Sequence, residues 1–247
     1  MEKSVFSCII KAKDVIQTCR KMEGKEFLRK VPLFSELSEE DLDRLINISR
    51  EKFYPKDSVI FQREEVGNFF FIICSGRVKV VIETEDGKEA ILSILYPTEF
   101  FGEMSLLDGE PRSASIVALE DTRVLIIQRD EFLKLLYTHP EMSLKILKTL
   151  SLRLRKANRQ IETLMFFDAP GRIARILLDI VLDKGIKTEK GIAVDLDFTR
   201  QELGSLIGVS RETATRTLKA FEEEGIITVE KNHIIVHNLE KLKKRIY

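Results

Sequence analysis

The sequence predicts an α+β fold in three parts: a β-rich domain of the jelly-roll type, a long helix, and a small helical domain with a β-hairpin. Short runs of β-branched and aromatic residues, broken by glycine, fill the segment from Phe53 to Gln128. From Asp130 the spacing of the apolar residues becomes helical. Beyond Gly171, three helical segments precede a short hairpin. We therefore expect two folded regions joined by a helix.

The β-rich domain is expected to span residues 31–136, after an N-terminal helical tail over residues 1–30. Ser38, followed by acidic residues, predicts the N-cap of a helix near its start. Ser75-Gly76 predicts a first hairpin and Asp86-Gly87 a second. Many short antiparallel strands favour a jelly roll over a parallel sheet. The expected strands are Phe69–Cys74, Val78–Glu83, Ala90–Leu95, Ser113–Ala118 and Arg123–Gln128.

A heptad pattern predicts one long helix over residues 137–167. Its apolar residues follow one another at alternating spacings of three and four, as in the seam of a two-stranded coiled coil. The alternative is an amphipathic helix packed on its own domain, which would show a broader apolar face. We expect a parallel homodimer through this helix. The seam residues are Leu147, Leu150, Leu154, Ala157, Ile161 and Leu164.

Residues 168–247 are predicted to form a winged helix-turn-helix domain. Asp168-Ala-Pro-Gly171 ends the long helix and is the predicted hinge. Gly208-Val209 is the expected turn between the last two helices of the motif. The expected helices are Arg172–Asp183, Thr199–Ile207 and Ser210–Glu224, and the expected hairpin pairs Ile226–Glu230 with His233–His237.

The last of these helices carries a polar face that can contact DNA. Arginine can bond guanine bidentately, and a carboxylate can accept from cytosine. Polar and basic side chains at the start of the preceding helix can hold phosphates. An ordinary solvated helix face is the alternative, and charge alone favours it. The candidate DNA-binding residues are Thr199, Arg200, Gln201, Ser210, Arg211, Glu212, Thr215 and Arg216, with Lys219 on the same face.

The segment Thr199–Leu218, TRQELGSLIGVSRETATRTL, resembles the helix-turn-helix of the CRP/FNR family of transcription regulators. The resemblance implies that Arg211, Glu212 and Arg216 read base edges, and all three match the cyclic-AMP receptor branch. FNR-type members lack the counterpart of Arg211. The resemblance further implies a palindromic site in double-stranded DNA with TGTGA-like half-sites, and a homodimer through the central helix.

A second candidate site lies in the segment Phe100–Ser115, FFGEMSLLDGEPRSAS. Gly102 can open a helical turn whose N–H groups face an anion. Arg112 supplies a fork-shaped cation for phosphate, and Ser113 adds a hydroxyl beside it. Glu103 can accept from a ribose hydroxyl. A Glu and an Arg nine residues apart also often just pair with each other.

This segment resembles the phosphate-binding cassette of cyclic-nucleotide-binding domains. The resemblance implies a cyclic nucleotide as effector, cyclic AMP before cyclic GMP or a related nucleotide. In the cyclic-AMP receptor a Thr-Ser pair on the dimer helix touches the adenine, and Ala157-Asn158 stand at that position here. Asn158 can bond a purine edge, whereas Ala157 cannot. The alternative is a cassette kept only as scaffold, in a regulator that works without nucleotide or senses redox state. The candidate ligand-binding residues are Gly102, Glu103, Met104, Arg112, Ser113 and Asn158.

Other function classes find little support in the sequence. The 40 basic and 40 acidic residues cancel, so no broad field marks a partner. No apolar run reaches the roughly 18 residues of a membrane span, and no signal peptide is evident, which predicts a cytoplasmic protein. No nucleophile–base set indicates an enzyme. The resemblance implies RNA polymerase as a partner at a Lys187–Asp195 loop, whose residues give no clear match. We expect no required cofactor or metal, because no ligand spacing occurs among Cys8, Cys19, Cys74, His139, His233 and His237.

Overall fold

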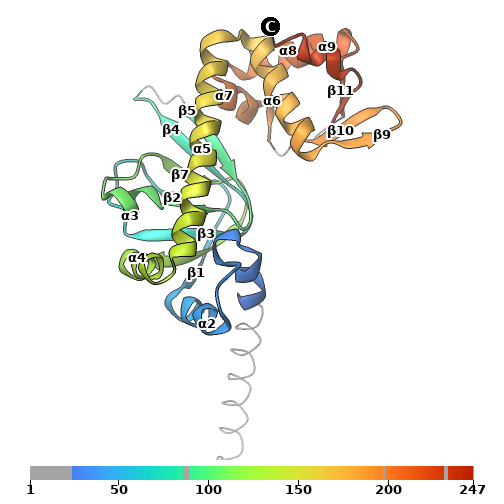
Figure 1. Cartoon of the computed structure of the whole chain (residues 1–247). Helices are drawn as coiled ribbons and strands as arrows, with labels where there is room; N and C mark the ends of the chain where they lie inside the picture. Colours follow the sequence, from blue (N-terminus) through green and yellow to red (C-terminus); the bar gives the residue numbers. More distant parts are fainter. Residues whose placement is uncertain (1–23, 86–88, 197, 231–232, 247) are drawn as a thin grey trace, which may run out of the picture. The chain divides into compact units, whose positions relative to one another are not determined.

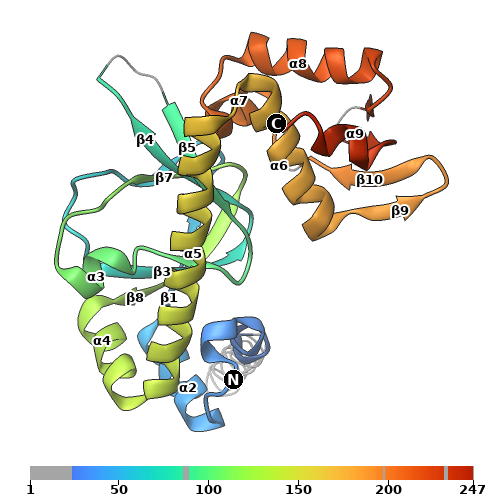
Figure 2. The same ribbon diagram turned by 45° about the horizontal axis from the view of Figure 1, so that its top comes forward.

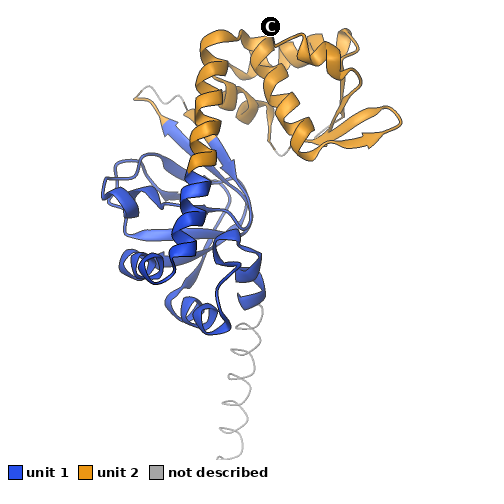
Figure 3. Ribbon diagram, viewed as in Figure 1, with its two compact units in different colours: residues 1–82, 93–150 blue, residues 83–92, 151–247 orange. Residues whose placement is uncertain are grey.

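The computed structural model of the chain describes residues 24–85, 89–196, 198–230 and 233–246 (Figure 1). Two compact units divide the chain (Figure 3). The first comprises residues 1–82 and 93–150, and the second comprises residues 83–92 and 151–247. Of the predicted N-terminal helical tail, residues 24–30 are helical, and residues 1–23 lie outside the described residues.

Two four-stranded sheets form the predicted β domain, and they lie in the first unit except for residues 83 and 89–92, which belong to the second. One sheet has the order β1-β8-β3-β6, and the other has the order β2-β7-β4-β5. The first is formed by β1 (Arg50–Tyr54), β8 (Thr122–Gln128), β3 (Phe69–Ser75) and β6 (Phe100–Phe101). The second is formed by β2 (Val59–Phe61), β7 (Ser115–Ala118), β4 (Val78–Glu83) and β5 (Glu89–Leu95).

Strand β3 contributes buried side chains to both faces of its sheet, because successive side chains along a strand point to opposite sides. Phe71 and Ile73 belong to a core cluster that also contains Val78 and Ile116 from the second sheet. Phe70 belongs to a different cluster, formed with the helices of the unit. Its ring stacks on that of Phe132, with centroids 4.1 Å apart. The β domain therefore has one core between the sheets and another beneath its helices.

The expected first hairpin at Ser75-Gly76 is wrong. Strand β3 pairs with β8 on one side and β6 on the other, so both of its edges are occupied and β4 joins the second sheet. Gly76 has φ +82°, and a Cβ there would lie 2.5 Å from Thr122 Oγ1. The chain therefore changes sheets at this glycine. The second expected pairing, β4 with β5, is confirmed, although its turn lies outside the described residues.

Short helices complete the first unit. Ser38 caps α2 (Glu39–Ile48) as predicted, since its side chain accepts from the Asp41 amide. The chain also forms a 3-10 turn, η1 (Pro32–Phe34), and two helices, α3 (Met104–Asp108) and α4 (Arg129–Thr138).

The long helix is α5 (Pro140–Phe166), within the predicted range of residues 137–167. Its first turns pack on the first unit through Met142 and Ile146. Farther along, most of the heptad stripe is open to solvent in the single chain. The exposed fractions are 59% for Leu147, 63% for Leu154, 54% for Ile161 and 48% for Leu164.

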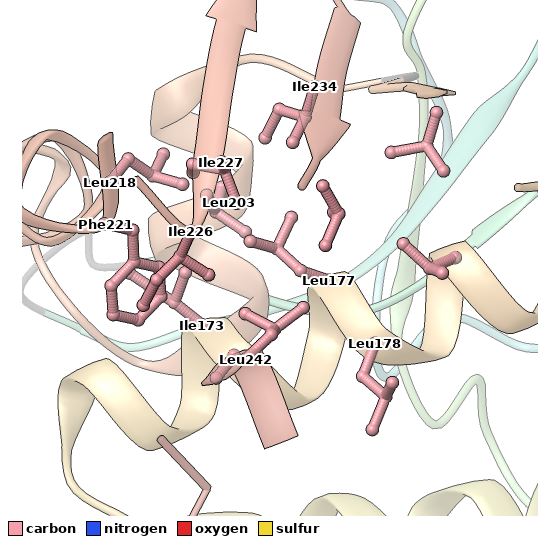
Figure 4. Packing of buried hydrophobic residues seen from close by; sticks show 14 of the residues in the cluster. Ile173, Leu177, Leu178, Leu203, Leu218, Phe221, Ile226, Ile227, Ile234 and Leu242 are labelled. Carbon is pink, nitrogen blue, oxygen red and sulfur yellow. The ribbon is translucent and has the colours of Figure 1, made fainter. Parts of the chain in front are cut away.

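The second unit has the predicted winged helix-turn-helix arrangement (Figures 1 and 2). Its helices are α6 (Ala169–Lys184), α7 (Arg200–Ile207) and α8 (Arg211–Glu223), and a short α9 (Leu239–Lys243) follows the wing. Figure 4 shows residues of α6, α7 and α8, among them Leu177, Leu203 and Phe221, packed around one core. Leu242 of α9 joins this core and is fully buried.

The wing is larger than expected. The Lys187–Asp195 segment, expected as a loop, forms a hairpin of β9 (Ile186–Thr188) and β10 (Gly191–Asp195). Strand β10 also pairs with β12 (His233–Val236), which pairs with β11 (Ile227–Glu230). The sheet order is therefore β11-β12-β10-β9. Val194 and Ile234 lie opposite each other and are both buried, which explains why β10 joins the sheet.

Candidate functional sites

Arg112 is a buried cation at the centre of the predicted ligand site. Only 4% of the residue is exposed. Its Nη1 donates to the carbonyl of Gly102 at 2.7 Å, and its Nη2 donates to that of Phe69 at 2.8 Å. The guanidinium carbon lies 4.2 Å from the centroid of the Phe61 ring, in a cation–π contact. Its buried Nε has no hydrogen-bond partner among the described residues. This arrangement leaves a fixed donor without an acceptor.

Two glycines allow the backbone to approach the guanidinium closely. Gly102 has φ +81°, and a Cβ there would lie 2.8 Å from Arg112 Nη1. A Cβ on Gly67 would lie 3.0 Å from the guanidinium carbon and 2.4 Å from the Cβ of Ser105. Neither position has room for a side chain.

The segment before β3 is hydrogen-bonded to the backbone of Arg112. The Glu64 amide donates to the Arg112 carbonyl, and the Arg112 amide donates to the Glu65 carbonyl, each at 2.9 Å. Burial lowers the pKa of the Arg112 guanidinium, while the charges of Glu103 and Glu65 partly oppose this shift. Glu103 is itself only 3% exposed. The site therefore places carboxylates close to one buried cation.

The structure brings five of the predicted ligand-binding residues into one region. Gly102, Glu103 and Arg112 lie together as described. Met104 and Ser113 are exposed beside them, with the Ser113 hydroxyl 3.8 Å from the Met104 sulfur. Asn158 is an exposed residue of α5 and belongs to the other compact unit.

Sequence reasoning did not identify Phe61 and Gly67 as part of this site. Phe61 reads as an ordinary strand aromatic, and Gly67 as an ordinary turn residue. Their contacts with Arg112 connect positions far apart in the chain. A search for aromatic residues at the ends of predicted strands would have listed Phe61 among many equivalent candidates.

Helix α8 has the two faces that the sequence predicts. Ser210 caps it by accepting from the Thr213 amide at 3.1 Å. The residues packed inward include Ala214, Leu218 and Phe221, all buried. The exposed face consists of Arg211, Glu212, Thr215, Arg216 and Lys219.

The polar groups on this face differ in their availability. The Thr215 hydroxyl donates to the Arg211 carbonyl at 2.8 Å, so its proton is used within the helix. The backbone amide of Glu212 itself, followed by the Ser210 hydroxyl, lowers the pKa of the Glu212 carboxyl, which favours the ionised acceptor. Arg216 has no hydrogen-bond or ion-pair partner within the part of the chain that the structure describes.

Helix α7 positions the remaining predicted DNA contacts. A capping box between Thr199 and Glu202 fixes its first turn. Gln201 is exposed, and Arg200 is half-buried, with an Nη1 that lacks a partner among the described residues. A Cβ on Gly204 would lie 2.7 Å from the Val209 carbonyl, so this glycine allows α7 to pack closely against the turn that leads into α8.

Both regions match known families. Residues 51–139 match the family described as "Cyclic nucleotide-binding domain", and residues 171–245 match that described as "Crp-like helix-turn-helix domain". The chain belongs to the CRP family of transcription regulators. Membership accounts for a DNA-binding helix-turn-helix domain and a cyclic-nucleotide-binding domain in one chain.

Individual relatives cover most of the chain. A "CRP-like cAMP-activated global transcriptional regulator" of Mycobacterium tuberculosis is 33% identical over 192 residues, which are 78% of this chain and 86% of the relative. A "Cyclic AMP receptor protein" of Thermus thermophilus is 35% identical over 196 residues, 79% of this chain and 88% of the relative. A solved structure of a CooA mutant from Carboxydothermus hydrogenoformans has a TM-score of 0.74 at 29% identity, and the match covers 81% of this chain and 89% of that one.

Three further properties bear on function. Within the described ranges, no group of three or more His, Cys, Asp or Glu residues could hold a metal ion. Burial, followed by the charge of Glu51, raises the pKa of the Cys74 thiol to about 12, which keeps it protonated at neutral pH. Cys8 and Cys19 lie outside the described residues. None of the described helices is both long and apolar enough to cross a membrane.

Proposed function

We propose that this CRP-family chain is a non-enzymatic, dimeric regulator whose binding to a TGTGA-like palindrome is controlled by a cyclic nucleotide, with cyclic AMP as the first candidate. The observation that carries the proposal is the buried Arg112 guanidinium, whose Nε has no hydrogen-bond partner among the residues that the structure describes. Keeping a cation out of water with an unused donor costs free energy unless an anion completes the site. The names of the M. tuberculosis and T. thermophilus relatives support cyclic AMP as that anion.

The residues around Arg112 fit a nucleotide phosphate and ribose. The Nε–H of Arg112 and the exposed hydroxyl of Ser113 would donate to phosphate oxygens. The buried Glu103 carboxylate would accept from the ribose 2′-hydroxyl. Asn158 would supply the contact to the base, because its amide can both donate and accept.

The proposed dimer buries the stripe on α5. Leucine and isoleucine side chains that are 48–63% exposed in one chain would pack against the same residues of a second copy. A parallel dimer places two α8 helices on two successive major grooves, about 34 Å apart. The ligand would favour the dimer arrangement in which both helices reach the DNA. The segment predicted as a hinge, Asp168–Gly171, forms the N-cap and first turn of α6, so the change of direction lies between α5 and this cap. A ligand that binds both arrangements equally shifts nothing.

The test of this function is DNA binding with and without nucleotide. Fluorescence anisotropy on a labelled palindrome with TGTGA half-sites should show a large gain in affinity with cyclic AMP. Cyclic GMP and 5′-AMP, assayed in parallel, identify the effector and control for a non-specific nucleotide effect. Equal DNA affinity under all conditions would rule out gating by these ligands.

Arg211→Ala is expected to weaken binding to the palindrome by about 5- to 150-fold, the equivalent of about 1–3 kcal/mol for a lost bidentate contact with guanine. The loss of DNA affinity caused by Arg211→Ala should be smaller on an operator in which the guanine that Arg211 would contact is already replaced by another base. Lys243→Ala, which removes a positive charge from α9 of the same domain where it pairs with Glu240 at 2.8 Å, is the control. The same relative loss on every sequence would assign Arg211 to phosphate contact instead.

A second candidate is a family regulator that works without nucleotide. It is favoured by the two backbone carbonyls that already accept from Arg112, because these bonds let the arginine serve as a structural link. Calorimetry with the nucleotide panel separates the two functions, since this candidate predicts no heat of binding. Redox sensing through Cys74 finds no support in its raised thiol pKa.

A further inference from the structure

Arg172, near the start of α6, donates to three backbone carbonyls that belong to different segments. Its Nη2 donates to Leu164 in the last turn of α5 at 2.9 Å, and its Nε donates to Phe167, just after α5, at 2.9 Å. Its Nη1 donates to Ile207, the last residue of α7, at 3.2 Å. All four residues lie within the second compact unit. The end of α5, the start of α6 and α7 lie together in both ribbon views (Figures 1 and 2).

The position of this guanidinium suits the chemistry of helix ends. The last carbonyls of an α-helix have no partner within the helix and carry partial negative charge. A cation at the ends of α5 and α7 satisfies carbonyls of both at once. The planar guanidinium has three separate nitrogens and holds three carbonyls at fixed, separate positions, whereas a lysine ammonium offers its three donors from a single nitrogen. Arg172 therefore links the ends of two helices, whereas an arginine on the surface would make no such connection.

The helix that Arg172 holds leads directly to the DNA-reading helix. Gly208 follows Ile207 with φ +70°, and a Cβ on Gly208 would lie 3.4 Å from Leu164 Cδ2. Helix α7 also packs closely on the turn into α8 through Gly204. Arg172 therefore bonds the end of α5 to the end of α7, and α7 in turn packs closely on the turn that leads into α8.

We propose that Arg172 is the positioning residue that couples the dimer helix α5 to the helix-turn-helix, so that a rearrangement of α5 is transmitted to the DNA-reading helix. The proposal rests on the ligand-controlled function given above. It assigns no contact with nucleotide or DNA to Arg172. It concerns the ratio of DNA affinities with and without ligand. If Arg172 were needed only for folding, its substitution would leave this ratio unchanged in the molecules that fold.

The test compares Arg172→Gln, Arg172→Lys and Arg175→Gln in the full-length protein. Arg175 is the matched control, because it lies on the same helix but pairs within it, with Asp179 at 3.4 Å. In Arg172→Gln the ratio of DNA affinities with and without cyclic AMP should fall at least fivefold, the lower limit of typical allosteric coupling. Affinity for cyclic AMP, measured in the absence of DNA, should change far less. Arg172→Lys should recover only part of the ratio, and Arg175→Gln should behave as wild type.

Hydrogen–deuterium exchange gives a readout that needs no ligand. Peptides covering residues 160–172 and 200–210 should exchange faster in Arg172→Gln than in wild type or Arg175→Gln. Unchanged exchange and an unchanged affinity ratio in the folded Arg172→Gln protein would overturn the coupling role. If wild type itself shows no nucleotide response while exchange rises in Arg172→Gln, the proposed function fails and the physical link stands.

Discussion

Arg112→Leu is expected to abolish the binding of cyclic AMP. Leucine removes both the positive charge and the Nε–H, which has no partner within the described part of the chain. A hydrogen bond to a charged group contributes about 1.5–3 kcal/mol, so the loss of the Nε–H contact alone lowers affinity about 10- to 150-fold, and the loss of the positive charge beside the phosphate lowers it further. Isothermal titration calorimetry measures this loss directly. The DNA affinity of the variant should then be the same with and without nucleotide.

The substitution also tests the structural part played by Arg112. It leaves the carbonyls of Gly102 and Phe69 without their donor, at a cost of about 1–3 kcal/mol each, so the melting temperature should fall. Arg123→Leu removes an arginine of the same unit that is exposed and pairs with Glu51 at 3.5 Å, and it should keep wild-type affinity. Unchanged nucleotide affinity in a folded Arg112→Leu protein would refute the assigned site.

Leu154→Glu is expected to convert the dimer to a monomer and to abolish tight binding to the palindrome. In a parallel coiled coil, a glutamate at this seam position would face its copy across the interface, so two carboxylates would lose water beside each other. The side chain is 63% exposed in the single chain, so the fold of each chain should be retained. Sedimentation or light scattering gives the mass, and anisotropy gives the DNA affinity.

A matched control exists two residues earlier. Leu152 is 58% exposed on the same helix, but it falls outside the stripe, at the heptad position farthest from the seam. Leu152→Glu should therefore remain dimeric and bind DNA as wild type. A dimer in Leu154→Glu, or a monomer in Leu152→Glu, would place the interface elsewhere.

Features that depend on near neighbours in the chain were predictable from the sequence. The caps at Ser38 and Ser210 form as predicted because the donors and acceptors lie three residues apart. The inward and outward faces of α8 follow from a helical period of 3.6 residues. The heptad stripe on α5 likewise needs only residue spacing, and its exposure in the single chain agrees with the pattern.

The sheet partners were not predictable in the same way. Ser75-Gly76 satisfied the local rules for a hairpin, yet β3 pairs with β8 and β6. Likewise, the alternating pattern at Ile192 and Val194 is too short to predict a strand. In the structure this segment is a strand because it pairs with β12. Strand pairing depends on which distant segments pack best against one another, and the turn residues between two strands are only one contribution to that choice.

The sequence by itself determined that the chain has a β-rich domain, a heptad helix and a winged helix-turn-helix, and it identified Arg112, Arg211 and Glu212 as candidates. Only the tertiary structure decided how Arg112 is held, since its acceptor Phe69 is 43 residues away. It alone revealed Arg172, whose bond to Ile207 spans 35 residues. The guanidinium of an arginine can bond distant carbonyls or an anion only after the chain has folded and placed them next to it. The spacing of residues along the sequence does not show which distant groups will become neighbours.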